Sequence, residues 1–133
     1  MRRESGFSLI ELMIVVVIIG ILAAIIYPSY INSVQKTNRA DAKNTMLQVA
    51  SQEERYYTEN QVYGSLTAIG NATDPILSQS GHHSVTVVTA NAGATYTITA
   101  TPTNYTDSTC GNLTMTNTGV TSSTVAAAAG VCW

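Results

Sequence analysis

The chain begins with an almost uninterrupted apolar stretch, which covers residues 7–26 and contains a single acid, Glu11. A helix of about 20 residues is about 30 Å long, which matches the hydrocarbon core of a bilayer. Arg2 and Arg3 precede the stretch, and basic residues favour the cytoplasmic side of a membrane. We therefore expect a spanning helix with a cytoplasmic N-terminus, followed by an exported remainder.

The helical pattern continues beyond Pro28. No Gly or Pro occurs between Ser29 and Tyr57, and apolar residues recur close to every 3.6 positions. This pattern predicts one helix of about 50 residues, about 75 Å long, whose second half packs an apolar stripe on a small domain. The stripe comprises Tyr27, Ile31, Val34, Ala42, Met46, Val49 or Ala50, and Tyr56 or Tyr57. The opposite, solvated face comprises Gln35, Lys36, Arg39, Lys43, Asn44, Gln48 and Gln52.

The hydrophobic period changes to two in the second half of the chain. Residues 60–81 lack periodicity and predict an irregular connection. Alternation over 84–89, 95–101 and 112–116 then predicts three strands, with a hairpin turn at 91–93 and a further strand from Val120. The fold class is therefore α+β, with the long N-terminal helix packed on a small antiparallel sheet. Seven side chains should face the helix: Val85, Val87, Tyr96, Ile98, Ala100, Leu113 and Met115.

Length and charge restrict the function. The chain has 133 residues, of which 45% are hydrophobic and 11% charged, with a net charge of -2. That length excludes a multidomain enzyme, and the slight acidic excess disfavours general nucleic-acid binding. From Pro75 onward the only charged residue is Asp107.

The two cysteines, Cys110 and Cys132, are not part of a CxxC pair, which argues against redox catalysis and zinc clusters. Two interpretations remain, namely a disulfide or two separate thiols, and the compartment decides between them. Export would favour the disulfide.

Residues with catalytic or binding chemistry are sparse. His82 and His83 are adjacent, so on a strand they point to opposite faces and do not form a metal site together. We find no nucleophile motif and no phosphate loop, and expect no catalytic, metal or cofactor site. Lys36, Arg39 and Lys43 form a basic stripe that could contact DNA. We favour instead a solvated face, or charge pairing between subunits with Asp41, Glu53 or Glu54.

Residues 6–13, with the sequence GFSLIELM, resemble the processing and assembly motif of type IV pilins and their pseudopilin relatives. The resemblance implies that a prepilin peptidase cuts between Gly6 and Phe7 and methylates the Phe7 amine. It also implies that Glu11 pairs with the N-terminal amine of a neighbouring subunit during filament assembly. Gly20 and Pro28 match positions between which the helix of the family loosens in a filament.

The rest of the chain resembles a narrower group, the PilE-type minor pilins. The resemblance is carried by residues 54–60, Tyr63, 96–102, Asp107, 110–114, Gly119 and the closing Cys132-Trp133. It implies a pilin fold with a leader at 1–6, a transmembrane and filament-core segment at 7–28, and a periplasmic domain at 29–133.

The function implied is that of a structural subunit, minor rather than major, of a type IV pilus, which serves assembly and through it adhesion, twitching motility or DNA uptake. Its expected partners are other pilin subunits, the prepilin peptidase and the inner membrane, which it leaves for an extracellular fibre. The alternatives are a type II secretion pseudopilin, a DNA-binding pilin that acts as an uptake receptor, and a signal-anchored periplasmic enzyme.

Overall fold

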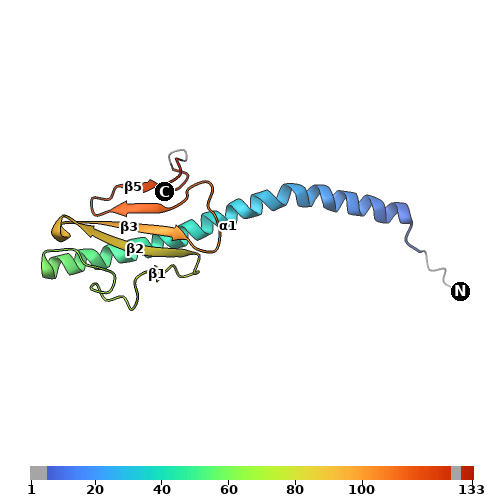
Figure 1. Cartoon of the computed structure of the whole chain (residues 1–133). Helices are drawn as coiled ribbons and strands as arrows, with labels where there is room; N and C mark the ends of the chain where they lie inside the picture. Colours follow the sequence, from blue (N-terminus) through green and yellow to red (C-terminus); the bar gives the residue numbers. More distant parts are fainter. Residues whose placement is uncertain (1–5, 127–129) are drawn as a thin grey trace. The chain divides into compact units, whose positions relative to one another are not determined.

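A computed structural model describes residues 6–126 and 130–133. It contains one long helix, α1 (Leu9–Asn60), and a five-stranded sheet (Figure 1). The predicted leader therefore lies outside the described residues except for Gly6. The chain forms two compact units, of which the first ends at Gln35 and the second comprises Lys36–Trp133.

Helix α1 passes through Pro28 without ending, as predicted. Its first turn is closed by the Ser8 carbonyl, which accepts hydrogen bonds from the amides of Glu11 and Leu12. It ends at Asn60, a few residues beyond the predicted end, because Gln61 adopts a left-handed conformation with φ 60°. The amide of Gln61 bonds the Tyr57 carbonyl and satisfies one terminal acceptor.

The N-terminal part of α1 is long and apolar enough to cross a membrane, with a mean hydropathy of 3.2 over its best 18-residue window. None of that window is buried within the chain. The exposed apolar side chains continue through Tyr27, Ile31 and Val34. The prediction that these three begin the buried stripe was wrong, because they belong to the unit that ends at Gln35.

The sheet is antiparallel and follows the order β1-β2-β3-β4-β5. Its strands are β1 (Ile76–Leu77), β2 (His83–Ala90), β3 (Thr95–Pro102), β4 (Leu113–Thr116) and β5 (Thr121–Ser123). The four predicted strands are present close to their expected bounds. The edge strand β1 was not predicted, because two residues are too short to show a period.

The core lies between residues 36–60 of α1 and one face of the sheet. Ala42, Met46 and Val49 from the helix join one buried cluster with Val85, Tyr96, Ile98, Ala100, Leu113 and Met115 from the strands. Val87 is partly buried against it. The core-facing residues of the sheet are therefore those predicted. The helix adds polar residues that the pattern did not place there, namely Asn38, Arg39, Thr45 and Glu53.

Candidate functional site

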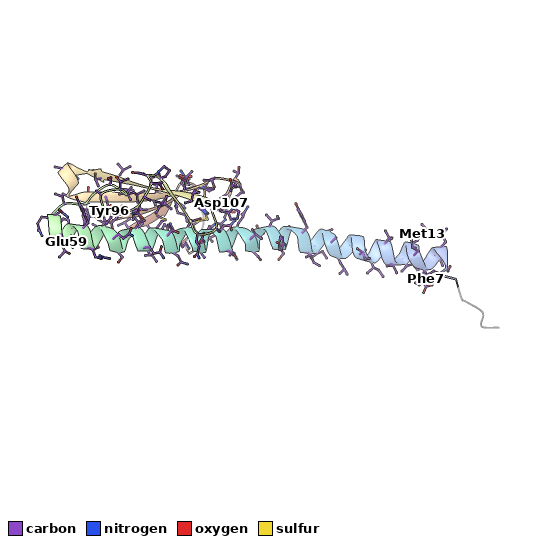
Figure 2. All side chains as sticks on the ribbon, turned by 90° about the horizontal axis from the view of Figure 1, so that it is seen from below. Phe7, Met13, Glu59, Tyr96 and Asp107 are labelled. Carbon is purple, nitrogen blue, oxygen red and sulfur yellow. A yellow bond between two sulfur atoms is a disulfide. The ribbon has the colours of Figure 1, made fainter. Side chains whose placement is uncertain are left out.

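The expected processing site lies at the beginning of the described chain. Gly6 and Phe7 precede α1 without regular structure, and Phe7 is 76% exposed (Figure 2). Glu11 is exposed in the first turn of the helix, four positions after Phe7. Such a segment leaves the peptide bond between Gly6 and Phe7 accessible, and leaves the Glu11 carboxylate available to another chain.

Gly20 and Pro28 both lie inside the continuous helix. A Cβ atom at Gly20 would meet nothing within 4 Å, so packing within the chain does not require a glycine there. Glycine lowers helix stability by about 1 kcal/mol, and proline removes one backbone donor. The segment between them is thus a helix with weakened local stability.

The predicted solvated face is wrong at Arg39, which is buried, whereas Lys36 of the same stripe is exposed. Arg39 is buried at 4% exposure and pairs with Asp107, with Nε 2.5 Å from Oδ2 and Nη2 2.7 Å from Oδ1. The pair is bidentate, the strongest arrangement for a guanidinium and a carboxylate. Figure 2 shows Asp107 in the layer of strands and loops over residues 36–60 of α1. The ion pair between Arg39 and Asp107 therefore links this layer to the helix.

Asp107 also organises the turn that leads to the disulfide. Its Oδ1 accepts hydrogen bonds from the amides of Thr109 and Cys110, at 3.1 and 3.0 Å. Burial opposes ionisation of this carboxyl, but the bonds from Arg39 and the two amides prevail and lower its pKa. The same bond to Asp107 raises the pKa of Arg39. Both groups are thus charged and mutually satisfied. The sequence distinguished Asp107 in one respect, because it is the only charged residue from Pro75 onward.

The other two residues of the stripe are in different surroundings. Lys36 is exposed, whereas the Lys43 ammonium lies 5.6 Å from the centroid of the Trp133 ring. Burial, followed by the nearby charge of Arg39, lowers the pKa of Lys43. The three cations therefore do not act as one patch.

The acids proposed as partners between subunits are also engaged within the chain. Asp41 accepts hydrogen bonds from the Ser80 amide and hydroxyl, and Glu54 accepts one from the Tyr63 hydroxyl. Glu53 is completely buried, and its Oε2 accepts a 3.0 Å hydrogen bond from the Gly64 amide. Burial, more than the nearby Glu54, raises the pKa of Glu53. The prediction that Glu53 could pair with another subunit was wrong, since no solvent reaches it.

His83 is buried, and its Nε2 lies 3.2 Å from the Tyr105 hydroxyl. Burial lowers the pKa of His83, so the ring is neutral at pH 7. Ser78 forms two hydrogen bonds with His83. The His83 amide donates to Ser78 Oγ, and the Ser78 amide donates to the His83 carbonyl. Across the described ranges 6–126 and 130–133, no three His, Cys, Asp or Glu residues form a group suited to a metal ion.

Cys110 and Cys132 form a disulfide, with their Cα atoms 5.7 Å apart. Cys110 is fully buried beside the core cluster, and the Val125 amide bonds its carbonyl. The predicted disulfide is therefore confirmed, and the loop that it closes contains β4 and β5.

Two family models match the chain. The prokaryotic N-terminal methylation motif matches residues 1–27, and the model described as "Type IV minor pilin ComP, DNA uptake sequence receptor" matches residues 28–114. The chain belongs to the family of type IV minor pilins. The second match covers more than half of this pilin and continues from where the first one ends.

Known proteins agree that the chain is a type IV pilin. The pilin is 32% identical to the type IV wide pilus major component PilA4 of Thermus thermophilus, over 92% of this chain and 95% of PilA4. It is 36% identical to the fimbrial protein EcpC of Eikenella corrodens, over 74% of this chain and 62% of EcpC. A type IV pilin structure from Shewanella oneidensis aligns with a TM-score of 0.53 at 26% identity, covering 73% of this chain and 94% of that one.

Secretion proteins also match, over a shorter region. The type II secretion system core protein G of Dickeya chrysanthemi is 34% identical over 47% of this chain. The pilin spans 40% of that relative and 62% of EcpC, so it covers less than two thirds of several curated relatives that it matches.

Proposed function

We propose that the chain is a structural subunit, of the minor class, of a type IV pilus. The observation that carries the proposal is the methylation motif at the head of an apolar helix whose side chains are unburied within the chain. Such a helix must be covered by lipid or by other chains. A processed pilin uses both in turn, first the membrane and then the filament.

The proposal assigns roles to the N-terminal residues. A prepilin peptidase cuts between Gly6 and Phe7 and methylates the new amine, and Glu11 pairs with that amine on a neighbouring subunit. A carboxylate in a spanning helix is costly and therefore usually has a function. Gly20 and Pro28 let the helix loosen when subunits pack.

The proposed topology follows from the same features. Arg2 and Arg3 hold the N-terminus in the cytoplasm, and the domain after residue 28 lies in the periplasm until the subunit leaves the inner membrane for the fibre. The disulfide between Cys110 and Cys132 supports this placement, because such bonds persist in oxidising compartments.

Mass spectrometry of sheared pili tests the processing. The filament-borne chain should begin with N-methylated Phe7 and contain 127 residues, the full 133 without the six of the leader. A chain that begins at Met1, or after Ala24, would contradict the proposal.

A variant tests the role of Glu11. Glu11→Val should insert into the membrane at least as well as the native chain, because it removes a charge from an apolar helix. It should nevertheless be absent from sheared pili. Glu59→Val is the control, since Glu59 is an exposed acid at the other end of α1, and this variant should be incorporated normally. Normal incorporation of Glu11→Val would disprove the assembly role.

A second candidate function is DNA uptake, and it is favoured by the family match over residues 28–114. The geometry gives it little electrostatic support, because Arg39 is neutralised by Asp107. The pseudopilin alternative rests on matches over less than half of the chain, whereas the similarity to PilA4 extends over nearly all of it.

A further inference from the structure

A polar groove runs between α1 and the segment that carries β1, entirely within the unit Lys36–Trp133. Figure 1 shows β1 at the edge of the sheet. The groove has a volume of about 460 Å³, within the range of small-molecule sites. Its principal polar and apolar lining residues are Asp41, Asn44, Gln48, Asn71, Leu77 and Gln79.

Four of these residues carry side-chain amides. Asn44 and Gln48 lie one helical turn apart on α1, and both are exposed. Asn71 is held in place by its Nδ2, which donates to Gln52 Oε1 at 3.0 Å and to the Leu66 carbonyl at 3.1 Å. Each amide offers an acceptor and two donors. The groove therefore presents both kinds of hydrogen-bonding group close together.

Asp41 supplies a fixed carboxylate at the same wall. Its Oδ2 accepts from the Ser80 amide at 2.9 Å and from the Ser80 hydroxyl at 2.6 Å. Burial opposes ionisation, but these bonds prevail and lower the pKa of Asp41. The Ser78 hydroxyl also bonds this carboxylate. A carboxylate has about four acceptor sites, so Asp41 can still accept a hydrogen bond from a ligand beside these partners.

Leu77 gives the groove an apolar surface. Its side chain is 62% exposed at the sheet edge, beside the half-buried Ile76. A ligand that has polar groups on its rim and an apolar face would satisfy the amides and cover Leu77 together. A wholly apolar ligand would leave the amides and Asp41 without partners, which is costly.

The charge of the groove excludes anions. The residues that line it include an acid and no lysine or arginine. Phosphate, sulfate and acidic sugars would be repelled by Asp41, and the lining contains no cation to offset this repulsion. The matching ligand is uncharged, rich in hydroxyl groups that both donate and accept, and small enough to enter the groove.

From this chemistry we propose that the groove binds a neutral sugar unit of a glycan. Neighbouring sugar hydroxyls donate to the Asp41 carboxylate and exchange hydrogen bonds with the amides of Asn44, Gln48 and Gln79, while the C–H face of the ring covers Leu77. The site lies apart from the N-terminal assembly residues, so the inference goes beyond the role of filament subunit.

The test uses the full chain in lipid nanodiscs on an array of neutral and acidic glycans. The neutral set contains glucose, galactose and N-acetylhexosamine oligomers, and the acidic set contains their sialylated and sulfated forms. Titration of the best neutral glycan follows. We expect binding to neutral glycans only, and at least about tenfold weaker binding by the double variant Asn44→Ala, Gln48→Ala.

Gln61→Ala is the matched control, because it removes an exposed amide at the end of α1, outside the groove, and should bind like the native chain. Asp41→Asn should weaken binding to the neutral glycan and reduce the discrimination against acidic ones. Circular dichroism of each variant verifies that it is folded. A failure of all neutral glycans to bind, a preference for acidic glycans or basic peptides, or native affinity in the double variant would overturn the proposal.

Discussion

Arg39 and Asp107 show how one residue pair can depend on the whole fold. They are 68 positions apart in the chain, yet they form the bidentate pair that joins the helix to the loop before Cys110. A lone guanidinium in that position would be buried without a counter-ion. Their burial makes the pair a structural feature and removes Arg39 from any ligand-binding surface.

Removal of one partner should therefore be costly. We expect Asp107→Ala to lower the free energy of unfolding by about 3–5 kcal/mol, because it leaves the Arg39 charge buried and unpaired. Urea unfolding of the full chain in detergent, followed by circular dichroism, measures the change.

Two further variants sharpen that measurement. The double variant Arg39→Met, Asp107→Asn should recover most of the loss, since it removes both charges and keeps an amide oxygen that accepts from the Thr109 and Cys110 amides. Lys36→Ala, at an exposed position on the same helix, should change stability by no more than about 0.5 kcal/mol. A cost of less than about 1 kcal/mol for Asp107→Ala would show that the pair contributes little.

Glu53 should make stability depend on pH. Its folded-state pKa is raised, chiefly by burial, so the protonated form is favoured in the folded chain. Its contribution to stability is thus complete below the unfolded value of about 4.3 and is lost as the pH rises through the folded pKa. Glu53→Gln keeps an acceptor for the Gly64 amide without the charge.

We therefore expect Glu53→Gln to match the native chain near pH 4 and to exceed its stability at pH 8. Urea midpoints between these pH values measure the difference. Glu54→Gln, at the exposed neighbouring position, is the control and should follow the native curve more closely. Parallel curves for Glu53→Gln and the native chain would refute this explanation.

At the scale of elements, the C-terminal part of the sheet depends on the disulfide. The strand β5 has only three residues, and a few bonds hold the chain around it, including those from the Thr124 amide to Asn112 and from Trp133 Nε1 to Ser122. The central strands β2 and β3 pair over eight positions. Stability should therefore differ between the two ends of the sheet.

Reduction of the bond between Cys110 and Cys132 should loosen β5 and the residues after it. In the chain-entropy model, a disulfide that closes a loop of this size raises the free energy of unfolding by about 3 kcal/mol. Hydrogen exchange should rise in β5 and around Cys132, and should stay slow in β2, β3 and residues 36–60 of α1. Uniform loss of protection would instead show that the bond supports the entire domain.

At the scale of the molecule, the net charge and the placement of the basic residues determine the affinity of the domain for DNA. From Ser29 onward there are four basic residues and six acids, a net charge of -2, and the most buried of the basic residues, Arg39, is neutralised by Asp107. Lys36, Lys43 and Arg55 remain to contact phosphate groups. Three such contacts give a slope of about -3 for the logarithm of affinity against the logarithm of salt concentration.

We therefore expect weak binding of double-stranded DNA at physiological salt, without sequence preference. Gel-shift titration of the full chain in nanodiscs at several salt concentrations measures affinity and slope. The variant Lys36→Ala, Lys43→Ala should weaken this binding further, whereas Thr58→Ala, which changes no charge, should not. Submicromolar affinity for one sequence, lost in the double lysine variant, would place DNA uptake ahead of the structural role.

Features that depend on local periodicity could be predicted from the sequence alone. The continuous apolar stretch and the 3.6-residue pattern specified α1 through Pro28, and the alternation of apolar residues with threonine specified four strands and their core-facing side chains. The motif at residues 6–13 marked the N-terminal candidate site in the same way, since its residues are neighbours in the chain. Each of these patterns is formed by residues that are close together in the chain.

Which polar residues are buried depends on contacts between distant parts of the chain. Nothing near Arg39 in the sequence distinguishes it from Lys36 or Lys43, because its partner Asp107 is brought to it by the loop after β3. Glu53 likewise meets its partner Gly64 only when the connection after α1 folds back. The groove beside β1 also arises from contacts between distant segments. A buried charge is stable only with a partner in space, and the position of that partner is set by the fold as a whole.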